Sequence, residues 1–244
     1  MRRSRSQPPD PVRLTPHASR LTTVFVVFDL DGTLIDGYAA IGDALAYAME
    51  KFGLEPLAPE KVRVMVGHGI EKLVDQAVGP ARASEGVRLF RARYPEVAVA
   101  KTRLMPDVPQ VLERLARRGH PMAVASNKPA RFSRMILEAC GVGRYFTAIA
   151  GPDDQTPAKP DSTMLERLMT AVAAEPGGTV VLGDMEVDSE FARAAGCRVV
   201  LVPGGSRTRE ELLGVDADAL LDRLADLPDW LERDATTANR APVL

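Results

Sequence analysis

Residues 24–36, VFVVFDLDGTLID, constrain the fold of this chain more than any other stretch. Five consecutive apolar residues lead into Asp29, a second carboxylate follows at Asp31, and Gly32 and Thr33 then interrupt the run. An apolar, β-branched run bounded by glycine is typical of a strand buried on both faces, which predicts a central strand of a parallel sheet. Two carboxylates at the end of such a strand are costly unless they are paired, hydrogen-bonded or bound to a metal, so we expect a cation site there.

Length and composition place the chain among ordinary globular enzymes. Its 244 residues allow one substantial core, or a core with a smaller inserted domain. The chain is 45% hydrophobic and 26% charged, and its net charge of −2 provides no large basic field, so we expect no nucleic-acid partner. No apolar run approaches the roughly 20 residues that span a bilayer, so we expect no membrane partner either.

The cysteines and the first residues bear on location. Cys140 and Cys197 are far apart in the sequence, which predicts small core residues rather than a disulfide framework or a metal cluster. Residues 1–22 contain five arginines, four prolines and a single acid, without an apolar segment after the arginines. This pattern predicts a disordered basic tail and not a secretory signal, and a cytoplasmic location is expected.

Strand-like and helix-like segments alternate after residue 104. Strands are predicted at residues 122–125, 148–150, 179–182 and 198–202, and helices at 108–118, 131–140, 162–174 and 188–195. Strands that alternate with helices require crossover connections. We therefore predict an α/β fold with a doubly wound, Rossmann-like parallel sheet.

The stretch between the first strand and this alternating region has a different pattern. Helices are predicted at residues 39–52, 59–65, 70–77 and 87–94, and no convincing strand occurs among them. The predicted organisation is a core of residues 23–36 and 104–232, a helical insert of residues 37–103 and a flexible tail of residues 233–244.

Polar residues follow successive predicted strands. Asp29 ends the first strand, Ser126 the second and Asp184 the fourth, and Lys159 lies in the loop after the third. Ligands of open α/β sheets bind outside the carboxyl ends of the strands, so the fold would collect these side chains at one edge.

Each of these residues also has a purely structural interpretation. Asp29 and Asp31 precede a glycine, as turn residues do, and Ser126 with Asn127 could cap the following helix. Lys159 alone would be a solvated surface lysine, and Asp188 could be a charge at a helix N-terminus. Their shared position at strand ends favours a common function.

Phosphoryl transfer through a covalent aspartyl-phosphate suits these groups. A carboxylate nucleophile such as Asp29 splits hydrolysis into two steps, and Asp31 can protonate the leaving oxygen and then deprotonate the attacking water. Several acids facing an anionic substrate need a hard cation, and oxygen ligands indicate Mg²⁺. Lys159 would neutralise the nucleophile and the phosphate, and Ser126 would hold phosphoryl oxygens.

From residue 24 to about 227 the sequence resembles the haloacid dehalogenase superfamily, in particular its phosphoglycolate phosphatase-like branch. The motifs FDLDGTLID, ASNKP, AKPD and GDMEVD occur in the family's order. The resemblance implies Asp29 as nucleophile, Asp31 as acid/base and Lys159 as the catalytic lysine. It implies phosphate binding by Ser126, Asn127, Gly32 and Thr33. It implies metal binding by Asp29, Asp184 and Asp188, with the backbone carbonyl of Asp31 completing the metal shell.

The same resemblance implies that residues 37–103 form a helical cap of the C1 type. The VGHG segment at 66–69 resembles a glycine-rich cap element, so His68 could face the substrate; alternatively it is exposed in a glycine turn. Two departures stand out. Met185 occupies a position where many relatives have Ser or Thr, and Gly37 one where Ser is frequent.

These inferences predict a Mg²⁺-dependent phosphatase of a small, phosphoglycolate-like phosphomonoester, acting as a monomer or homodimer. A sugar phosphomutase, a nucleotidase or a pyrophosphatase on the same core remains open, as does a catalytically silent binding protein. A dehalogenase is disfavoured because it works without the second acid that Asp31 supplies. A phosphonate hydrolase would need a Schiff-base lysine from the cap, and Lys51, Lys61 and Lys72 stand in no convincing motif.

Overall fold

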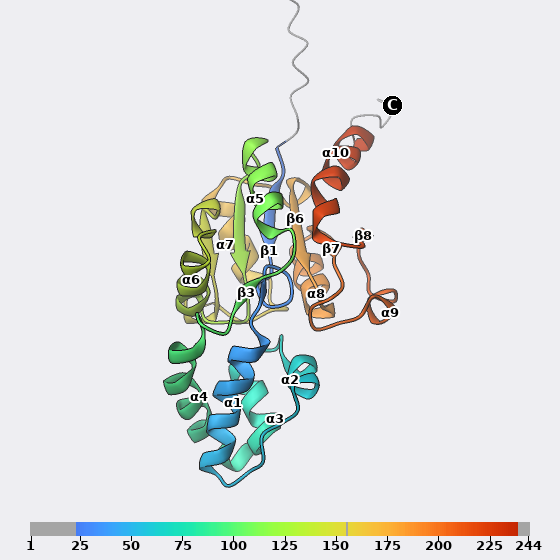
Figure 1. The fold of residues 1–244 in the computed structure, drawn as a ribbon. Coiled ribbons are helices and arrows are strands. Elements are labelled where there is room, and N and C mark those ends of the chain that lie inside the picture. The colour runs from blue at the N-terminus through green and yellow to red at the C-terminus, as the bar shows by residue number, and fades with distance from the viewer. Residues whose placement is uncertain (1–22, 155, 239–244) are drawn as a thin grey trace, which may run out of the picture.

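The computed structural model describes residues 23–154 and 156–238, and the expected N-terminal tail, residues 1–22, lies outside them. A six-stranded sheet forms the centre of the larger body (Figure 1). All its strand pairs are parallel, which confirms the predicted doubly wound sheet. From edge to edge the strands are β5 (Ala148–Ala150), β4 (Met122–Ala125), β1 (Phe25–Phe28), β6 (Thr179–Gly183), β7 (Arg198–Leu201) and β8 (Ala219–Leu220).

Strand β1 occupies the centre of this sheet because its side chains are apolar on both faces. Val26 lies opposite Met122 of β4 and Val180 of β6, and all three are at most 1% exposed. Alternate residues enter two separate cores, as the two-residue period of a strand requires. Val26 joins the first core and Val27 the second.

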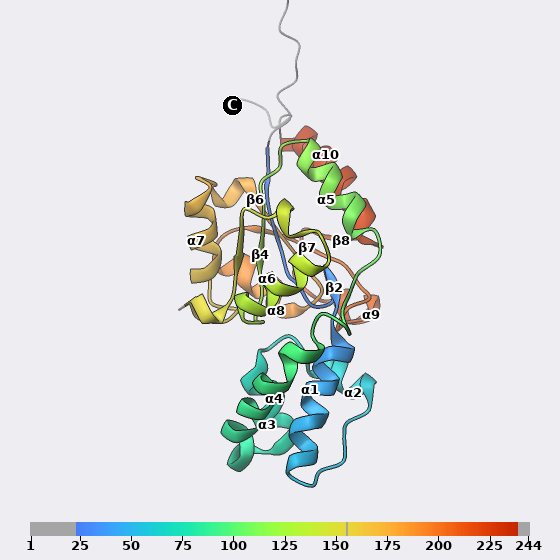
Figure 2. The ribbon, with the colours of Figure 1, turned by 60° about the vertical axis from the view of Figure 1, so that its left-hand side comes forward.

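Helices cover both faces of the sheet (Figure 2). The first core lies under α5 (Val108–Arg117), α6 (Ala130–Ala139) and α10 (Leu227–Ala238), and the second under α7 (Thr163–Ala171), α8 (Glu186–Ala194) and α9 (Arg209–Leu212). Helix α10 ends at Ala238 and so includes residues 233–238 of the expected flexible tail. The flexibility of this tail stays a prediction, and its residues 239–244 lie outside the described residues. Every helix among these described residues is too short or too polar to span a bilayer, and the cytoplasmic location stays a prediction.

A second body of helices lies at the carboxyl edge of the sheet (Figures 1 and 2). It contains α1 (Tyr38–Lys51), α2 (Pro59–Met65), α3 (Ile70–Val78) and α4 (Ala83–Val97). The chain enters it after β2 (Ile35–Asp36) and leaves it before β3 (Arg103–Leu104), and these two short strands pair antiparallel. We propose that the two bodies are the core and cap domains.

Short 3₁₀ helices complete the described elements: η1 (Pro80–Arg82), η2 (Gly143–Tyr145), η3 (Pro152–Asp154), η4 (Pro176–Gly178) and η5 (Leu224–Asp226). Helix α4 is longer than the predicted 87–94 and contains Pro95. The proline removes one helical hydrogen bond, but Tyr94 and Val97 on either side are 1% and 6% exposed. Burial of these side chains outweighs the lost bond, because each large apolar side chain contributes about 2 kcal/mol.

Candidate active site

The carboxyl edge of the sheet gathers the predicted polar residues. Asp29 follows β1, Ser126 follows β4, and Asp184 follows β6, so three adjacent strands deliver one side chain each. The backbone of Asp29 still belongs to the sheet, because its N–H donates to the Leu182 carbonyl at 2.8 Å. The first carboxylate is therefore held by a rigid strand end.

Lys159 reaches this edge from the loop before α7. Its ammonium donates to Asp29 Oδ1 at 2.9 Å and to Asp188 Oδ1 at 2.8 Å, and its side chain is 1% exposed. Burial alone would lower the pKa of Lys159, but the carboxylates of Asp188 and Asp29 raise it above its ordinary value. Lys159 is therefore a buried, permanent cation next to Asp29.

Asn127 fixes the loop that carries this lysine. Its Oδ1 accepts from the Lys159 backbone N–H at 2.7 Å, and its Nδ2 donates to the Lys159 carbonyl at 3.3 Å. The same Nδ2 donates to the Gly67 carbonyl of the helical body at 2.9 Å. The amide predicted to bind phosphate thus bonds to two backbone segments and joins the two bodies.

Three carboxylates form a compact acidic group. One oxygen from each of Asp29, Asp184 and Asp188 lies within 4.8 Å of the others. Burial, together with the neighbouring Asp188 and Asp31, raises the pKa of Asp29 to about 7, although Lys159 opposes the shift. Burial and the same kind of repulsion, from Asp29 and Asp188, raise the pKa of Asp184. Negative charge here lacks full compensation by the protein itself.

Backbone N–H groups and one hydroxyl hold the carboxylates of Asp184 and Asp188 in place. Asp188 Oδ2 accepts from the backbone N–H groups of Asp184 and Met185, both at 3.1 Å. Asp184 Oδ1 accepts from the Thr33 hydroxyl at 3.3 Å, and its Oδ2 accepts from the Ser206 N–H at 2.5 Å. Thr33, predicted to bind phosphate, therefore orients Asp184.

A divalent cation fits this acidic group. The donors are three buried carboxylate oxygens close together, and hard cations prefer such ligands. Burial and mutual repulsion raise the pKa of Asp29 and of Asp184, and a bound cation would offset both effects. Asp29 and Asp184 would hold the ion. Asp188 would add negative charge next to the ion without being its main ligand, because its oxygens already accept hydrogen bonds from Lys159 and from two backbone N–H groups.

The side chain of Asp31 lies outside the acidic group. Its Oδ2 pairs with the ammonium of Lys128 at 2.8 Å, and the two side chains are 10% and 7% exposed. Its Oδ1 is buried without a hydrogen-bond partner among the described residues. Gly37 lies against this oxygen, since a Cβ built there would be 2.7 Å from it. The glycine at position 37, where Ser is expected, thus lies next to the carboxylate of the predicted acid/base, Asp31.

Lys128 is a residue that sequence reasoning missed. It follows Asn127 in the ASNKP motif, but a lysine near a helix start is usually solvated. In the structure it is 8% exposed and lies 4.8 Å from the centre of the Tyr94 ring. Burial alone would lower the pKa of Lys128, but Asp31 raises it above its ordinary value. Its partner Asp31 is far away in the sequence, so no local pattern indicates that the two residues form a pair.

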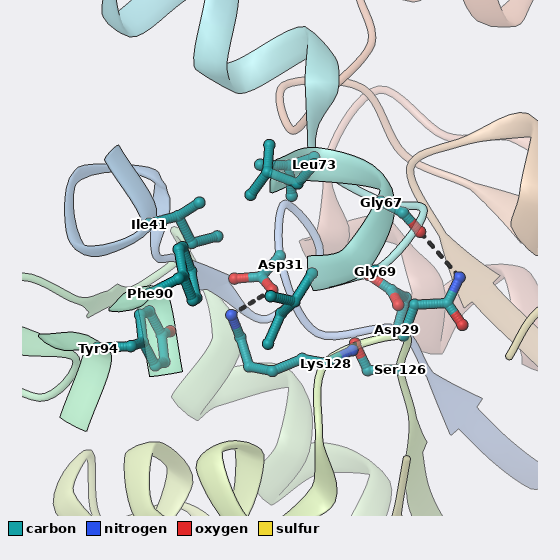
Figure 3. A pocket seen from close by; sticks show the side chains of 13 residues that line it. Asp29, Asp31, Ile41, Gly67, Gly69, Leu73, Phe90, Tyr94, Ser126 and Lys128 are labelled. Carbon is teal, nitrogen blue, oxygen red and sulfur yellow. Dashed lines mark hydrogen bonds and ion pairs between the residues drawn. The ribbon is translucent and has the colours of Figure 1, made fainter. Parts of the chain in front are cut away.

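A small cavity of about 50 Å³ lies between the sheet edge and the helical body (Figure 3). The core lines it with Asp29, Asp31, Ser126, Asn127 and Lys128, and the helical body with Ile41, Val66, Gly67, Gly69, Ile70, Leu73, Phe90 and Tyr94. Helical periodicity predicts that such apolar residues are buried. It does not tell which of them face a cavity.

His68 is exposed and is not among the residues that line the cavity, so the expectation that it faces the substrate is not supported. Partial burial and the nearby Lys72 and Arg207 lower its pKa. The flanking Gly67 and Gly69 have φ of 121° and 90°, which fits the alternative of an exposed glycine turn. Met185 is 2% exposed, and a Cβ at Gly67 would overlap its thioether. At position 185, a thioether that packs against Gly67 of the helical body thus takes the place of the hydroxyl expected there.

Gly205 gives a direct test of the tight packing around Asp184. A Cβ at this position would overlap Asp184 Oδ2 and would lie 2.7 Å from the Cα of Gly32. We expect Gly205→Ala to displace Asp184 and to lower kcat/KM by about tenfold or more, measured as phosphate release. Gly214→Ala is the matched control, because a Cβ there meets nothing within 4 Å. Equal activity of the two variants would contradict this packing.

Comparison with known proteins agrees with this geometry. The haloacid dehalogenase-like hydrolase family model matches residues 26–202. A phosphoglycolate phosphatase of Aquifex aeolicus (strain VF5) is 33% identical over 180 residues, which cover 74% of this chain and 84% of the relative. A phosphoglycolate phosphatase of Rhodospirillum rubrum is 34% identical over 217 residues, with 84% of this chain and 90% of the relative covered.

The fold has solved counterparts as well. The crystal structure of a predicted phosphoglycolate phosphatase from Haemophilus somnus 129PT superposes with a TM-score of 0.80 at 25% identity, over 86% of this chain and 98% of that one. The family match extends from β1 to the residue after β7 and so includes all four motifs. The chain therefore belongs to the haloacid dehalogenase-like hydrolase family, and within it to the phosphoglycolate phosphatase-like phosphatases.

Proposed function

We propose that this protein is a Mg²⁺-dependent phosphatase that hydrolyses a small phosphomonoester of the phosphoglycolate type through an aspartyl-phosphate on Asp29. One observation carries the proposal: Asp29 lines the cavity, is paired with the buried Lys159 at 2.9 Å and belongs to the group of three carboxylates. The phosphatases among its relatives support the reaction class.

In the first step an oxygen of Asp29 attacks phosphorus and the ester P–O bond breaks. Asp31, which also lines the cavity, gives its proton to the departing alcohol oxygen. The ammonium of Lys159, 2.9 Å from Asp29 Oδ1, balances the negative charge of the nucleophile. Ser126 lies beside the same cavity, where its hydroxyl can donate to a phosphoryl oxygen.

In the second step a water molecule attacks the phosphorus of the aspartyl-phosphate. Asp31 takes the proton of this water, the acyl P–O bond breaks, and Asp29 returns to a carboxylate as inorganic phosphate leaves. Asp31 can work in both steps because it is held next to the nucleophile, on the side that faces the helical body. The apolar residues of that body exclude bulk water from the reacting groups.

Mg²⁺, held by Asp29 and Asp184, would offset the negative charge of the carboxylates and the phosphate. The carboxylates themselves support this assignment, since they are crowded and buried. Mg²⁺ should therefore bind the wild-type protein measurably in titration calorimetry and bind Asp184→Asn much more weakly. Equal affinities would contradict the assignment.

A panel of phosphate esters tests the proposed activity. Phosphoglycolate, a sugar phosphate, a nucleoside monophosphate and pyrophosphate are assayed for phosphate release with Mg²⁺ and with a chelator. We expect Mg²⁺-dependent release, greatest from phosphoglycolate and occurring without any bisphosphate activator. The absence of release from every member would contradict a phosphatase, and a requirement for a bisphosphate would favour a phosphomutase.

A further inference from the structure

Lys128 brings a positive charge into the cavity at a point that the proposed chemistry does not use. Among the described residues that line the cavity it is the only basic one. It is 8% exposed, and lysines are almost never buried unless they are paired. Within the part of the chain that the structure describes, its ion-pair partner is Asp31, at 2.8 Å. An ammonium has three donors, so one carboxylate does not exhaust it.

The ammonium of Lys128 and the proposed nucleophile, Asp29, lie at opposite ends of the cavity (Figure 3). In Figure 3 the Lys128 side chain extends along the cavity, and its nitrogen lies beside Asp31 and the Tyr94 ring. Asp29 and Ser126 lie at the other side. A phosphate at Asp29 would therefore direct the rest of its ester toward Lys128.

The remaining walls restrict what that end of the ester can be. They include Ile41, Leu73 and Phe90, whose side chains offer no hydrogen-bonding group to a sugar hydroxyl or to a base. The hydroxyl of Tyr94, whose ring lies 4.8 Å from the Lys128 ammonium, is a polar group of the helical body at this end of the cavity. The cavity of about 50 Å³ also favours a short molecule. A charged ammonium in apolar surroundings attracts an anion strongly, because the local dielectric constant is low.

We propose that Lys128 binds a second anionic group of the substrate, a carboxylate, and so selects short phosphate esters that carry a carboxylate at the far end. This inference rests on the proposed phosphatase function and adds to it the residue that would recognise the far end of the ester. Lys128 keeps its contact with Asp31 while a further N–H donates to the substrate. One lysine thereby positions both the acid/base and the ester that it protonates.

Matched substrates test the proposal. Phosphoglycolate, ethyl phosphate and phosphoethanolamine share a short chain and place a carboxylate, a methyl group and an ammonium at its end. The wild-type protein should prefer them in that order of kcat/KM. Lys128→Met should lower kcat/KM for phosphoglycolate about 10- to 100-fold more than for ethyl phosphate. Intrinsic reactivity cancels, because both proteins are assayed with the same esters.

Further variants separate substrate binding from positioning of Asp31. A lysine that only orients Asp31 would, when replaced, lower turnover of all three esters by the same factor, and that result would overturn the proposal. Lys128→Arg keeps the charge and should keep the preference for phosphoglycolate. Lys128→Gln replaces the methionine variant if that variant does not fold. Lys101→Met, at an exposed pair with Asp43, is the matched control and should leave the preference unchanged.

A binding measurement gives a readout without turnover. In the Asp29→Asn background, calorimetry should show phosphoglycolate binding more tightly than ethyl phosphate, and Lys128→Met should remove this difference. Equal affinities in the Asp29→Asn protein would overturn the carboxylate subsite. Failure of the wild-type protein to hydrolyse any ester would instead contradict the proposed function. The two failures are therefore distinguishable.

Discussion

The Asp29→Asn variant is expected to lose turnover by more than about a thousandfold, as variants that lack a covalent nucleophile do. An amide cannot form the acyl phosphate, so no partial mechanism remains at this position. The fold should survive, because the change removes a carboxylate whose pKa is already raised to about 7 by burial and by neighbouring acids. Initial rates of phosphate release measure the loss.

Thermal unfolding provides the control for that experiment. The melting temperature of Asp29→Asn should stay within about 5 °C of the wild-type value, since the loss of the Lys159 pair is offset by relief of repulsion among the three carboxylates. Activity near the wild-type level in the folded variant would rule out Asp29 as the nucleophile.

The Lys159→Met variant is expected to lose both activity and stability. The lysine is 1% exposed and contacts Asp29 and Asp188, so its removal leaves two buried carboxylates without their cation. Breaking a buried pair in this way costs about 3–5 kcal/mol. For a chain of this size that corresponds to a fall of roughly 10 °C in the melting temperature, measured by circular dichroism.

A double variant distinguishes charge imbalance from lost packing. Lys159→Met with Asp188→Asn removes one of the two unpaired carboxylates and should recover part of the melting temperature. Lys101→Met, which breaks an exposed pair, should shift it by no more than about 2 °C. A Lys159→Met protein as stable as the wild type would show that the pair does not compensate the buried acids.

The sheet could be predicted because its strands carry strong local signals. Residues 25–28 and 122–125 are short apolar runs that end at polar residues, and parallel pairing then places Asp29 and Ser126 at one edge. Strand β8 could not be found this way. It consists of Ala219 and Leu220, and it forms because β7 offers a free edge.

The cavity was harder to predict because its geometry depends on contacts between distant segments. The helical pattern of residues 83–97 indicates that Phe90 and Tyr94 are buried, but it does not indicate that they face Asp31 and Lys128. Glycine spacing drew attention to His68, whereas the described structure leaves that side chain exposed. The sequence motifs located the polar residues of the site, such as Asp29 and Ser126. The apolar residues that line the cavity belong to no motif and could not be identified in this way.

Identification of the covalent intermediate tests the central claim most directly. The protein is mixed with phosphoglycolate and Mg²⁺, quenched in acid during turnover and reduced with borohydride, which converts an aspartyl-phosphate to homoserine. Peptide mass spectrometry then locates the change. We predict homoserine at position 29 in the wild-type protein and none in Asp29→Asn. Phosphate release without any modification at position 29, or with modification of a different carboxylate, would contradict the mechanism.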